Sequence, residues 1–176
     1  MGTLLRSGLV LSLLACAAFA DEDVVTAVSG TVKTVDKATK TAVVKTADGT
    51  EHTFHFVGRT VAHGAKAVGS GSKDAFLATK EGDEVVVHYT EKGAVKTATE
   101  VDHVGKDGLK ASVVVVKSVD HSAKTVTVKT AEGAEETYHL TGNAVVETGK
   151  GLDKAGKVTV YYTEEGGKKI AHFFKS

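Results

Sequence analysis

The sequence contains no proline and no tryptophan, and it has one methionine, Met1, and one cysteine, Cys16. Cys16 lies in the first 20 residues, which we expect to be removed, so the remaining chain would have no thiol. A chain without cysteine forms no disulfide, offers no thiolate nucleophile and cannot hold zinc through sulfur. These three kinds of chemistry are excluded for the remaining chain.

An excess of charge of one sign is also lacking, because 22 Lys and Arg residues balance 22 Asp and Glu residues. Removal of the first 20 residues takes away only Arg6 and leaves 21 basic against 22 acidic residues. Binding to nucleic acid or to an anionic membrane needs clustered positive charge. The composition therefore predicts that the protein binds neither nucleic acid nor an anionic membrane surface.

The first 20 residues have the pattern of a secretory signal peptide. Arg6 precedes an apolar run over residues 9–18, and Ala18-Phe19-Ala20 provides the small-x-small cleavage pattern. We expect cleavage after Ala20 and a periplasmic or secreted protein. Two alternatives are an uncleaved anchor helix and a lipid anchor at Cys16. No later stretch is apolar enough to span a membrane.

One stretch of about 30 residues occurs twice. Residues 32–61 and 116–145 agree at 16 of 30 positions without a gap, at an offset of 84. Self-similarity on this scale indicates a repeat architecture. It predicts a first repeat over residues 24–104, a linker over residues 105–110 and a second repeat over residues 111–176.

Comparison of the two copies predicts which side chains face inward. Ala42 and Val44 are apolar in both copies, whereas Val43 between them is matched by a threonine, so Val43 faces outward. In the next strand Phe54 points inward and His55 outward. The β-branched residues that dominate both copies suit a pleated, half-buried surface.

Spacing and turn residues predict the shape of each repeat. Val32 and Val35 are three apart, which indicates a β-bulge, Asp36 opens a turn, and Gly49 supplies the positive φ of a tight hairpin. Ser72 is the predicted N-cap of one or two helical turns between the third and fourth strands. The acidic residues mostly fall in turns.

Five short curled strands in each repeat predict an all-β chain of two tandem OB-like small barrels. A short helix is possible between the third and fourth strands of the first barrel. The rival architecture is half of an open β-sandwich. Because the predicted linker is short, we expect the two units to touch and to bury Phe173 and Phe174.

Three motifs carry a resemblance to a known family. They are Gly-x-Val-x-x-Val-Asp from residue 30, Thr-x-x-Val-Lys-Thr-Ala-Asp-Gly from residue 41, and Gly-Asp-Glu-Val-Val-Val-His-Tyr-Thr from residue 82. The chain resembles exported bacterial small β-barrel modules of unknown function, and the resemblance implies a fold more than an activity. Some periplasmic OB barrels carry copper or silver through His and Met beside a Trp. This chain lacks that set, which argues against Cu(I).

Histidine is the one potentially functional residue type present in excess, with eight copies. Neutral imidazole binds Zn, Cu(II) or Ni. One hypothesis is a site built from His52, His55 and His88 with His63 from a loop. Only His55 recurs in the second copy, as His139, whereas Tyr161 replaces His88 there. The candidate metal residues are His55, His88 and His139. The alternative is that these are solvated surface histidines.

No catalytic motif is present, since the chain has neither a Gly-x-Ser-x-Gly elbow nor a phosphate-binding loop. We therefore expect a protein that is not an enzyme and needs no cofactor. The first hypothesis is an exported, non-catalytic binding or interaction module for an unknown protein or small ligand. Tyr161, Tyr162, Phe173 and Phe174 would give it contact area if they were exposed. The alternative is a periplasmic protein that binds Cu(II), Ni or Zn through surface histidines.

Overall fold

The computed structural model describes residues 26–64, 74–146, 151–152 and 156–176. The predicted leader, its cleavage at Ala20, the lipidation site Cys16 and the predicted cap Ser72 all lie outside these residues. Within the described part of the chain, no helix is long and apolar enough to cross a membrane.

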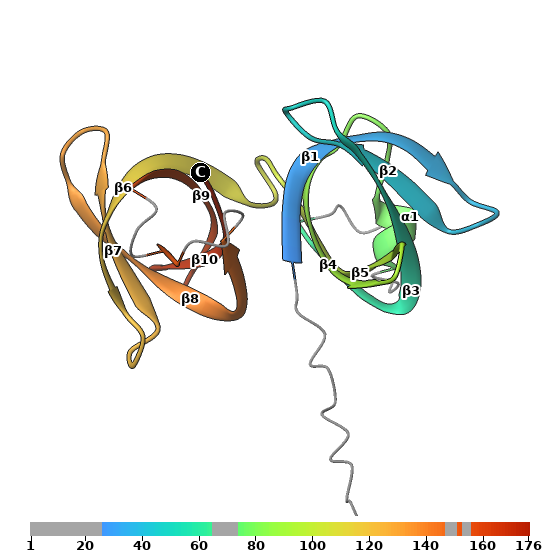
Figure 1. Ribbon diagram of the computed structural model, residues 1–176. Coiled ribbons are helices and arrows are strands. Elements are labelled where there is room, and N and C mark those ends of the chain that lie inside the picture. The colour runs from blue at the N-terminus through green and yellow to red at the C-terminus, as the bar shows by residue number, and fades with distance from the viewer. Residues whose placement is uncertain (1–25, 65–73, 147–150, 153–155) are drawn as a thin grey trace, which may run out of the picture.

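The first half of the chain forms a closed five-stranded barrel (Figure 1). Its strands pair in the order β1-β2-β3-β5-β4, and only β3 and β5 run parallel. The strands are β1 (Thr26–Asp36), β2 (Thr41–Lys45), β3 (Glu51–His63), β4 (Glu84–Lys92) and β5 (Val95–His103). The helix α1 (Ala75–Ala78) lies between β3 and β4 in sequence, and the Asp74 carboxylate caps it by accepting a hydrogen bond from the Phe76 amide.

The second half forms another closed barrel with the same order of pairing, β6-β7-β8-β10-β9. Its strands are β6 (Lys110–Asp120), β7 (Thr125–Thr130), β8 (Glu135–Val146), β9 (Lys157–Glu165) and β10 (Lys168–Lys175). The prediction of an all-β chain with two five-stranded small barrels is confirmed. Closure of both sheets is inconsistent with the rival open β-sandwich.

The bends and turns follow from local chemistry. The register of β1 and β2 shifts between Val32 and Thr34, which places the predicted bulge there. The Asp36 carboxylate accepts a hydrogen bond from the Ala38 amide at 2.8 Å, as expected for a turn residue. Gly49 has a φ of 89°, the conformation predicted for the hairpin.

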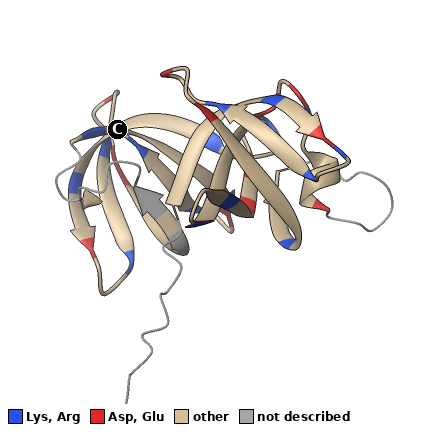
Figure 2. Cartoon of the chain, turned by 45° about the vertical axis from the view of Figure 1, so that its right-hand side comes forward, with Lys and Arg blue, Asp and Glu red and all other residues tan. Residues whose placement is uncertain are grey.

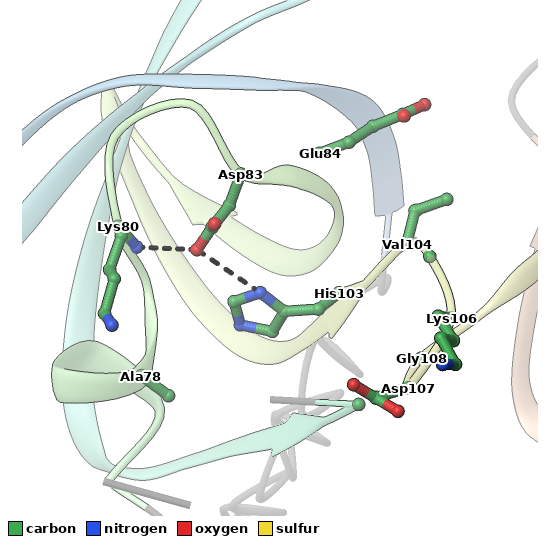
Figure 3. A pocket seen from close by; sticks show the side chains of 11 residues that line it. Ala78, Lys80, Asp83, Glu84, His103, Val104, Lys106, Asp107 and Gly108 are labelled. Atoms are coloured by element: carbon green, nitrogen blue, oxygen red, sulfur yellow. Dashed lines mark hydrogen bonds and ion pairs between the residues drawn. The ribbon is translucent and has the colours of Figure 1, made fainter. Parts of the chain in front are cut away.

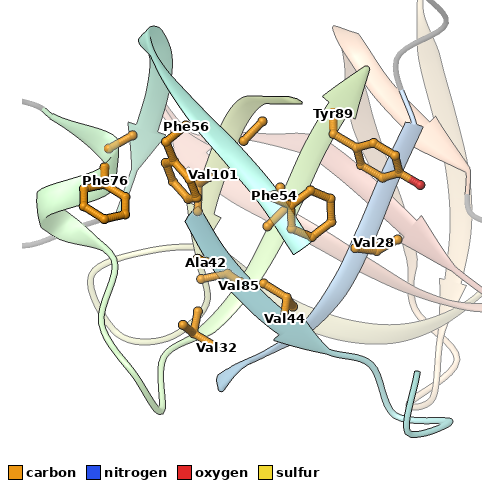
Figure 4. Close-up of a cluster of buried hydrophobic side chains, with 13 residues drawn as sticks. Val28, Val32, Ala42, Val44, Phe54, Phe56, Phe76, Val85, Tyr89 and Val101 are labelled. Carbon is orange, nitrogen blue, oxygen red and sulfur yellow. The ribbon is translucent and has the colours of Figure 1, made fainter. Parts of the chain in front are cut away.

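Each barrel encloses its own apolar core (Figure 4 shows the first). Ala42, Val44 and Phe54 point into the first barrel and are buried, as the comparison of the two copies predicts, and His55 is exposed. Phe54 packs against Tyr89 with 5.1 Å between the ring centroids. Because each core is filled from its own strands, each barrel has an interior that does not depend on the other.

A third apolar cluster joins the two barrels. It contains Ala27 and Val86 from the outside of the first barrel, Tyr161 and Phe173 from the outside of the second, and Leu109 between them. The predicted contact between the two units is therefore present, and Phe173 lies in it. Phe174 instead belongs to the core of the second barrel.

The aromatic pairs considered as exposed contact area are not exposed. Tyr161 and Phe173 are buried between the barrels, and Tyr162 and Phe174 are buried in the core of the second barrel. An interaction surface made of these side chains is therefore ruled out.

The connection between β5 and β6 is short and tightly packed. Val104 and Leu109 form an isolated bridge, and the Leu109 amide donates to the carbonyl of His103 at 2.7 Å. A Cβ atom on Gly108 would lie 1.9 Å from that same carbonyl oxygen, so only glycine fits there. This connection leads directly from the end of β5 into the contact between the barrels.

Gly30 allows β1 to approach β2 closely, because a Cβ atom there would lie 2.4 Å from the Lys45 carbonyl oxygen. We expect Gly30→Ala to destabilise the protein by about 1–3 kcal/mol, the usual cost of overpacking. Urea denaturation measures this cost. Gly58→Ala is the matched control, since Gly58 also lies in a strand and has no atom within 4 Å of the added methyl. Equal effects of the two substitutions would contradict the prediction.

Candidate metal centre

A β-bulge in β5 turns two carboxylates toward the second barrel. The register of β4 and β5 shifts so that Tyr89 pairs with Ala98 but His88 pairs with Glu100. One extra residue inverts the alternation of a strand. Ala98 and Val101 therefore both face the core, whereas Glu100 and Asp102 face outward.

A corresponding bulge in β10 presents a histidine from the other side. The register of β9 and β10 shifts between Ala171 and Phe173, with His172 as the extra residue. Ala171 lies in the core of the second barrel and Phe173 lies between the barrels. His172, only 8% exposed, is directed at the two carboxylates of β5.

Four side chains meet at this place, and we call them the junction centre: His63, Glu100, Asp102 and His172. One donor atom from each lies within 4.8 Å of every other. His63 Nδ1 lies 2.8 Å from Asp102 Oδ1 and 3.0 Å from Glu100 Oε1. His172 Nδ1 lies 3.6 Å from Asp102 Oδ2 and 3.8 Å from Glu100 Oε1. The first barrel supplies three of these side chains and the second barrel one.

The junction centre is buried on one side and open on the other. Asp102 is fully buried, whereas the side chain of His63 is 47% exposed. The rings of His63 and His172 lie 6.1 Å apart, edge to face, and His172 Nε2 is 3.1 Å from Thr163 Oγ1. The centre is therefore closest to solvent on the side of His63.

Both carboxylates of the junction centre are held in the charged form. Burial pushes the pKa of Asp102 up, but the hydrogen bond with His63 and the nearby imidazoles of His88 and His172 outweigh burial and hold it at about 2. The interaction with His172 lowers the pKa of Glu100 more than burial and the charge of Asp102 raise it. The hydrogen bond with Asp102 raises the pKa of His63, against the effect of burial. Two negative charges therefore lie among three imidazoles.

The donor set fits a divalent cation. Metal–donor distances of about 2.0–2.2 Å place all ligands of one ion within roughly 4.4 Å of each other, close to the spacing found here. Imidazole nitrogen and carboxylate oxygen together suit Zn, Ni, Co or Cu(II), whereas Cu(I) prefers sulfur. Asp102 Oδ2 also has no hydrogen-bond partner within the described structure.

The structure separates the three histidines predicted as metal ligands. His55 is exposed on β3 of the first barrel, and His139 lies on β8 of the second. His88 is buried on the outside of β4, next to Asp102. His52, also considered, contacts Lys96 instead, with 2.8 Å between its Nδ1 and Nζ. His63 is the last residue of β3 and belongs to the junction centre.

Three members of the centre, Glu100, Asp102 and His172, are not among the predicted residues. Glu100 and Asp102 lie on a strand, so the expectation that acidic residues mostly occupy turns misses them. The signal was present in the sequence, because residues 100 and 102 are two apart in a strand and share a face. The apolar Val86 on the outside of β4 was a second signal, since it indicates that this face is covered.

A cavity of about 300 Å³ lies next to the connection between the barrels, and none of the four residues of the junction centre lines it (Figure 3). His103 Nδ1 lies 3.5 Å from Asp83 Oδ2, which also accepts a hydrogen bond from the Lys80 amide. Burial lowers the pKa of His103 more than the charges of Asp83 and Asp102 raise it. His103 Nε2 is buried and has no hydrogen-bond partner within the described structure.

Charge outside the junction centre is evenly mixed. Figure 2 shows Lys and Arg interspersed with Asp and Glu along the strands of both barrels. Extended fields of one sign are what attract nucleic acid or anionic lipid. The expectation that nucleic acid is not a partner rests on the composition, with 22 basic and 22 acidic residues.

Fold and centre together define a small closed β-barrel architecture with a histidine–carboxylate cluster where two barrels meet. No protein-family model matches the chain, and no curated protein matches it. Solved structures similar to it include silver-bound CusF, at 16% identity over 46% of this chain and 97% of that chain, with a TM-score of 0.33. Apo-CusF from Escherichia coli matches at 16% identity over 49% of this chain and 94% of that chain, with a TM-score of 0.35. The likeness concerns the small-barrel fold.

Proposed function

We propose that this protein is a non-catalytic binding protein for a divalent transition metal, held where the two barrels meet. The observation that carries the proposal is the convergence of His63, Glu100, Asp102 and His172 within 4.8 Å. The leader predicted from the sequence favours an exported, periplasmic or secreted location. The proposal keeps the metal-binding hypothesis but moves the site from the surface histidines to the contact between the barrels.

The chemistry of the centre favours Zn, Ni, Co or Cu(II). Two carboxylates whose pKa values are lowered carry charge that offsets the charge of the ion. The two imidazoles select against Mg and Ca, which prefer oxygen ligands alone. Sulfur is absent from the centre, which disfavours Cu(I) and Ag(I).

A binding role is favoured over a catalytic one by the surroundings of the centre. Three of the four side chains are largely buried, and only His63 faces solvent substantially. The exposed side of His63 leaves an ion held here accessible to small ligands such as water.

Titration of the metal-free protein with Zn²⁺, in competition with a chromophoric chelator, tests the proposal. We expect one Zn²⁺ bound per chain, with binding strongly weakened by His172→Ala, which removes the only ligand from the second barrel. His55→Ala is the matched control, because His55 is an exposed strand histidine away from the centre. Absence of Zn²⁺, Ni²⁺, Co²⁺ and Cu²⁺ binding, or loss of binding in the control alone, would refute the proposal.

A further inference from the structure

His88 is the least exposed histidine of the chain as described, with 1% of its surface accessible, yet it lies outside the four donors of the junction centre. It projects from the outside of β4, on the same face as Val86, because Val85 and Val87 fill the core. The second barrel covers this face. The sequence alignment of the two copies places Tyr161 at the equivalent position of the second barrel, where the surroundings are apolar.

Both ring nitrogens of His88 are buried, and neither has a hydrogen-bond partner within the described structure. Asp102 Oδ2 is likewise buried and lacks a hydrogen bond. His88 Nε2 lies 3.5 Å from this oxygen, just beyond a well-formed hydrogen bond. Buried polar groups are rarely left unsatisfied, and the exceptions concentrate where a ligand or a functional state completes the set.

The two oxygens of Asp102 face different partners. Oδ1 lies 2.8 Å from His63 Nδ1, within the centre, whereas Oδ2 lies between His88 Nε2 and His172 Nδ1 at 3.5 and 3.6 Å. Imidazoles therefore approach the carboxylate on two sides, but only the contact at Oδ1 has hydrogen-bond length. Carboxylates that hold a metal are in turn fixed by outer hydrogen-bond donors, and loss of such a donor weakens metal binding.

We propose that His88 is a positioning residue for the metal: it donates its Nε2–H to Asp102 Oδ2 and fixes the carboxylate in its metal-binding orientation. This rests on the proposed function of the junction centre. A small shift of the Asp102 carboxylate toward His88 turns the 3.5 Å contact into a hydrogen bond. His88 Nε2 and Asp102 Oδ2 then each gain a hydrogen-bond partner in the metal-bound state. Residue 88 thereby connects β4 to the centre without ligating the ion.

Zn²⁺ affinity, measured by chelator competition, tests this role in wild type, His88→Leu, His88→Gln and the control His55→Leu. We expect His88→Leu to weaken Zn²⁺ binding by about 10–100-fold, the usual effect of losing an outer partner of a metal ligand. Glutamine retains an N–H donor at a similar reach, so His88→Gln should recover most of the affinity. His55→Leu should bind as wild type does.

The outcomes separate this inference from the proposed function. A wild type that binds no metal refutes the proposed function, whereas normal Zn²⁺ binding by His88→Leu overturns only the role of His88. If His88→Leu does not fold, nitrogen-15 NMR of the wild-type histidines decides the question. We expect His88 to keep its proton on Nε2 when Zn²⁺ is bound. A metal-ligated shift at Nε2 would make His88 a ligand and overturn the positioning role.

Discussion

Replacing Asp102 with asparagine is expected to lower the Zn²⁺ affinity of the protein by at least about 100-fold, more than the loss of an outer partner usually costs. Asp102 approaches His63, His88 and His172, the last from the other barrel. Asparagine has nearly the same size but lacks the negative charge and one of the two acceptor oxygens. The substitution therefore removes the charge that holds the ion without leaving a cavity.

Asp83→Asn is the matched control for this substitution. Asp83 is also next to a histidine, with 3.5 Å between its Oδ2 and His103 Nδ1, but it is not one of the four donors of the junction centre. We expect the control to bind Zn²⁺ with wild-type affinity. Circular dichroism checks that both variants are folded. An Asp102→Asn variant that is folded and binds Zn²⁺ as tightly as wild type would contradict the role given to Asp102.

Truncation of Phe54 to alanine is expected to destabilise the first barrel by about 3–5 kcal/mol, the usual cost of removing a buried phenylalanine ring. Phe54 is completely buried and packs against Tyr89. The second barrel has its own core, which contains none of these side chains. We therefore expect thermal unfolding to separate into two transitions, with the first barrel unfolding at the lower temperature.

Differential scanning calorimetry measures both transitions in a single experiment. Val57→Ala serves as the control, because Val57 lies on the same strand but is 40% exposed and should change stability little. A cost below about 1 kcal/mol for Phe54→Ala would contradict the core assignment. A single transition at a lower temperature would show that the contact between the barrels makes them unfold together.

The internal architecture of each barrel could be read from the sequence because it depends on local rules. Alternation identified Ala42, Val44 and Phe54 as inward-facing. Three-residue spacing located the bulge after Val32, and an acidic turn residue was expected at Asp36. Periodicity and turn chemistry act over a few residues, so one sequence suffices to recognise them.

The junction centre could not be derived in the same way, because it depends on how two barrels meet. Alternation of side chains along the strand correctly places His88 on the outer face of the first barrel. It does not show that the second barrel covers that face. The bulges at Thr99 and His172 also invert the local alternation, and they determine which way Glu100 and His172 point. Neither bulge is marked by a glycine, although Ala98 and Val101, like Ala171 and Phe174, face the core at a spacing of three residues.

Comparison of the two copies contains a further signal of the contact between the barrels. Glu100 and His88 of the first copy align with Phe173 and Tyr161 of the second, so equivalent positions are polar in one copy and aromatic in the other. All four lie where the barrels meet. The inward-facing residues of these strands are preserved between the two copies, whereas these outward-facing residues differ. Such a difference indicates that the outward face makes specific contacts.

The most direct test of the account is anomalous X-ray diffraction at the zinc edge from crystals of the protein grown with one equivalent of Zn²⁺. We predict a single strong peak bounded by His63, Glu100, Asp102 and His172, with ligands from both barrels. Peaks only at exposed histidines such as His55, or no peak between the barrels, would contradict it.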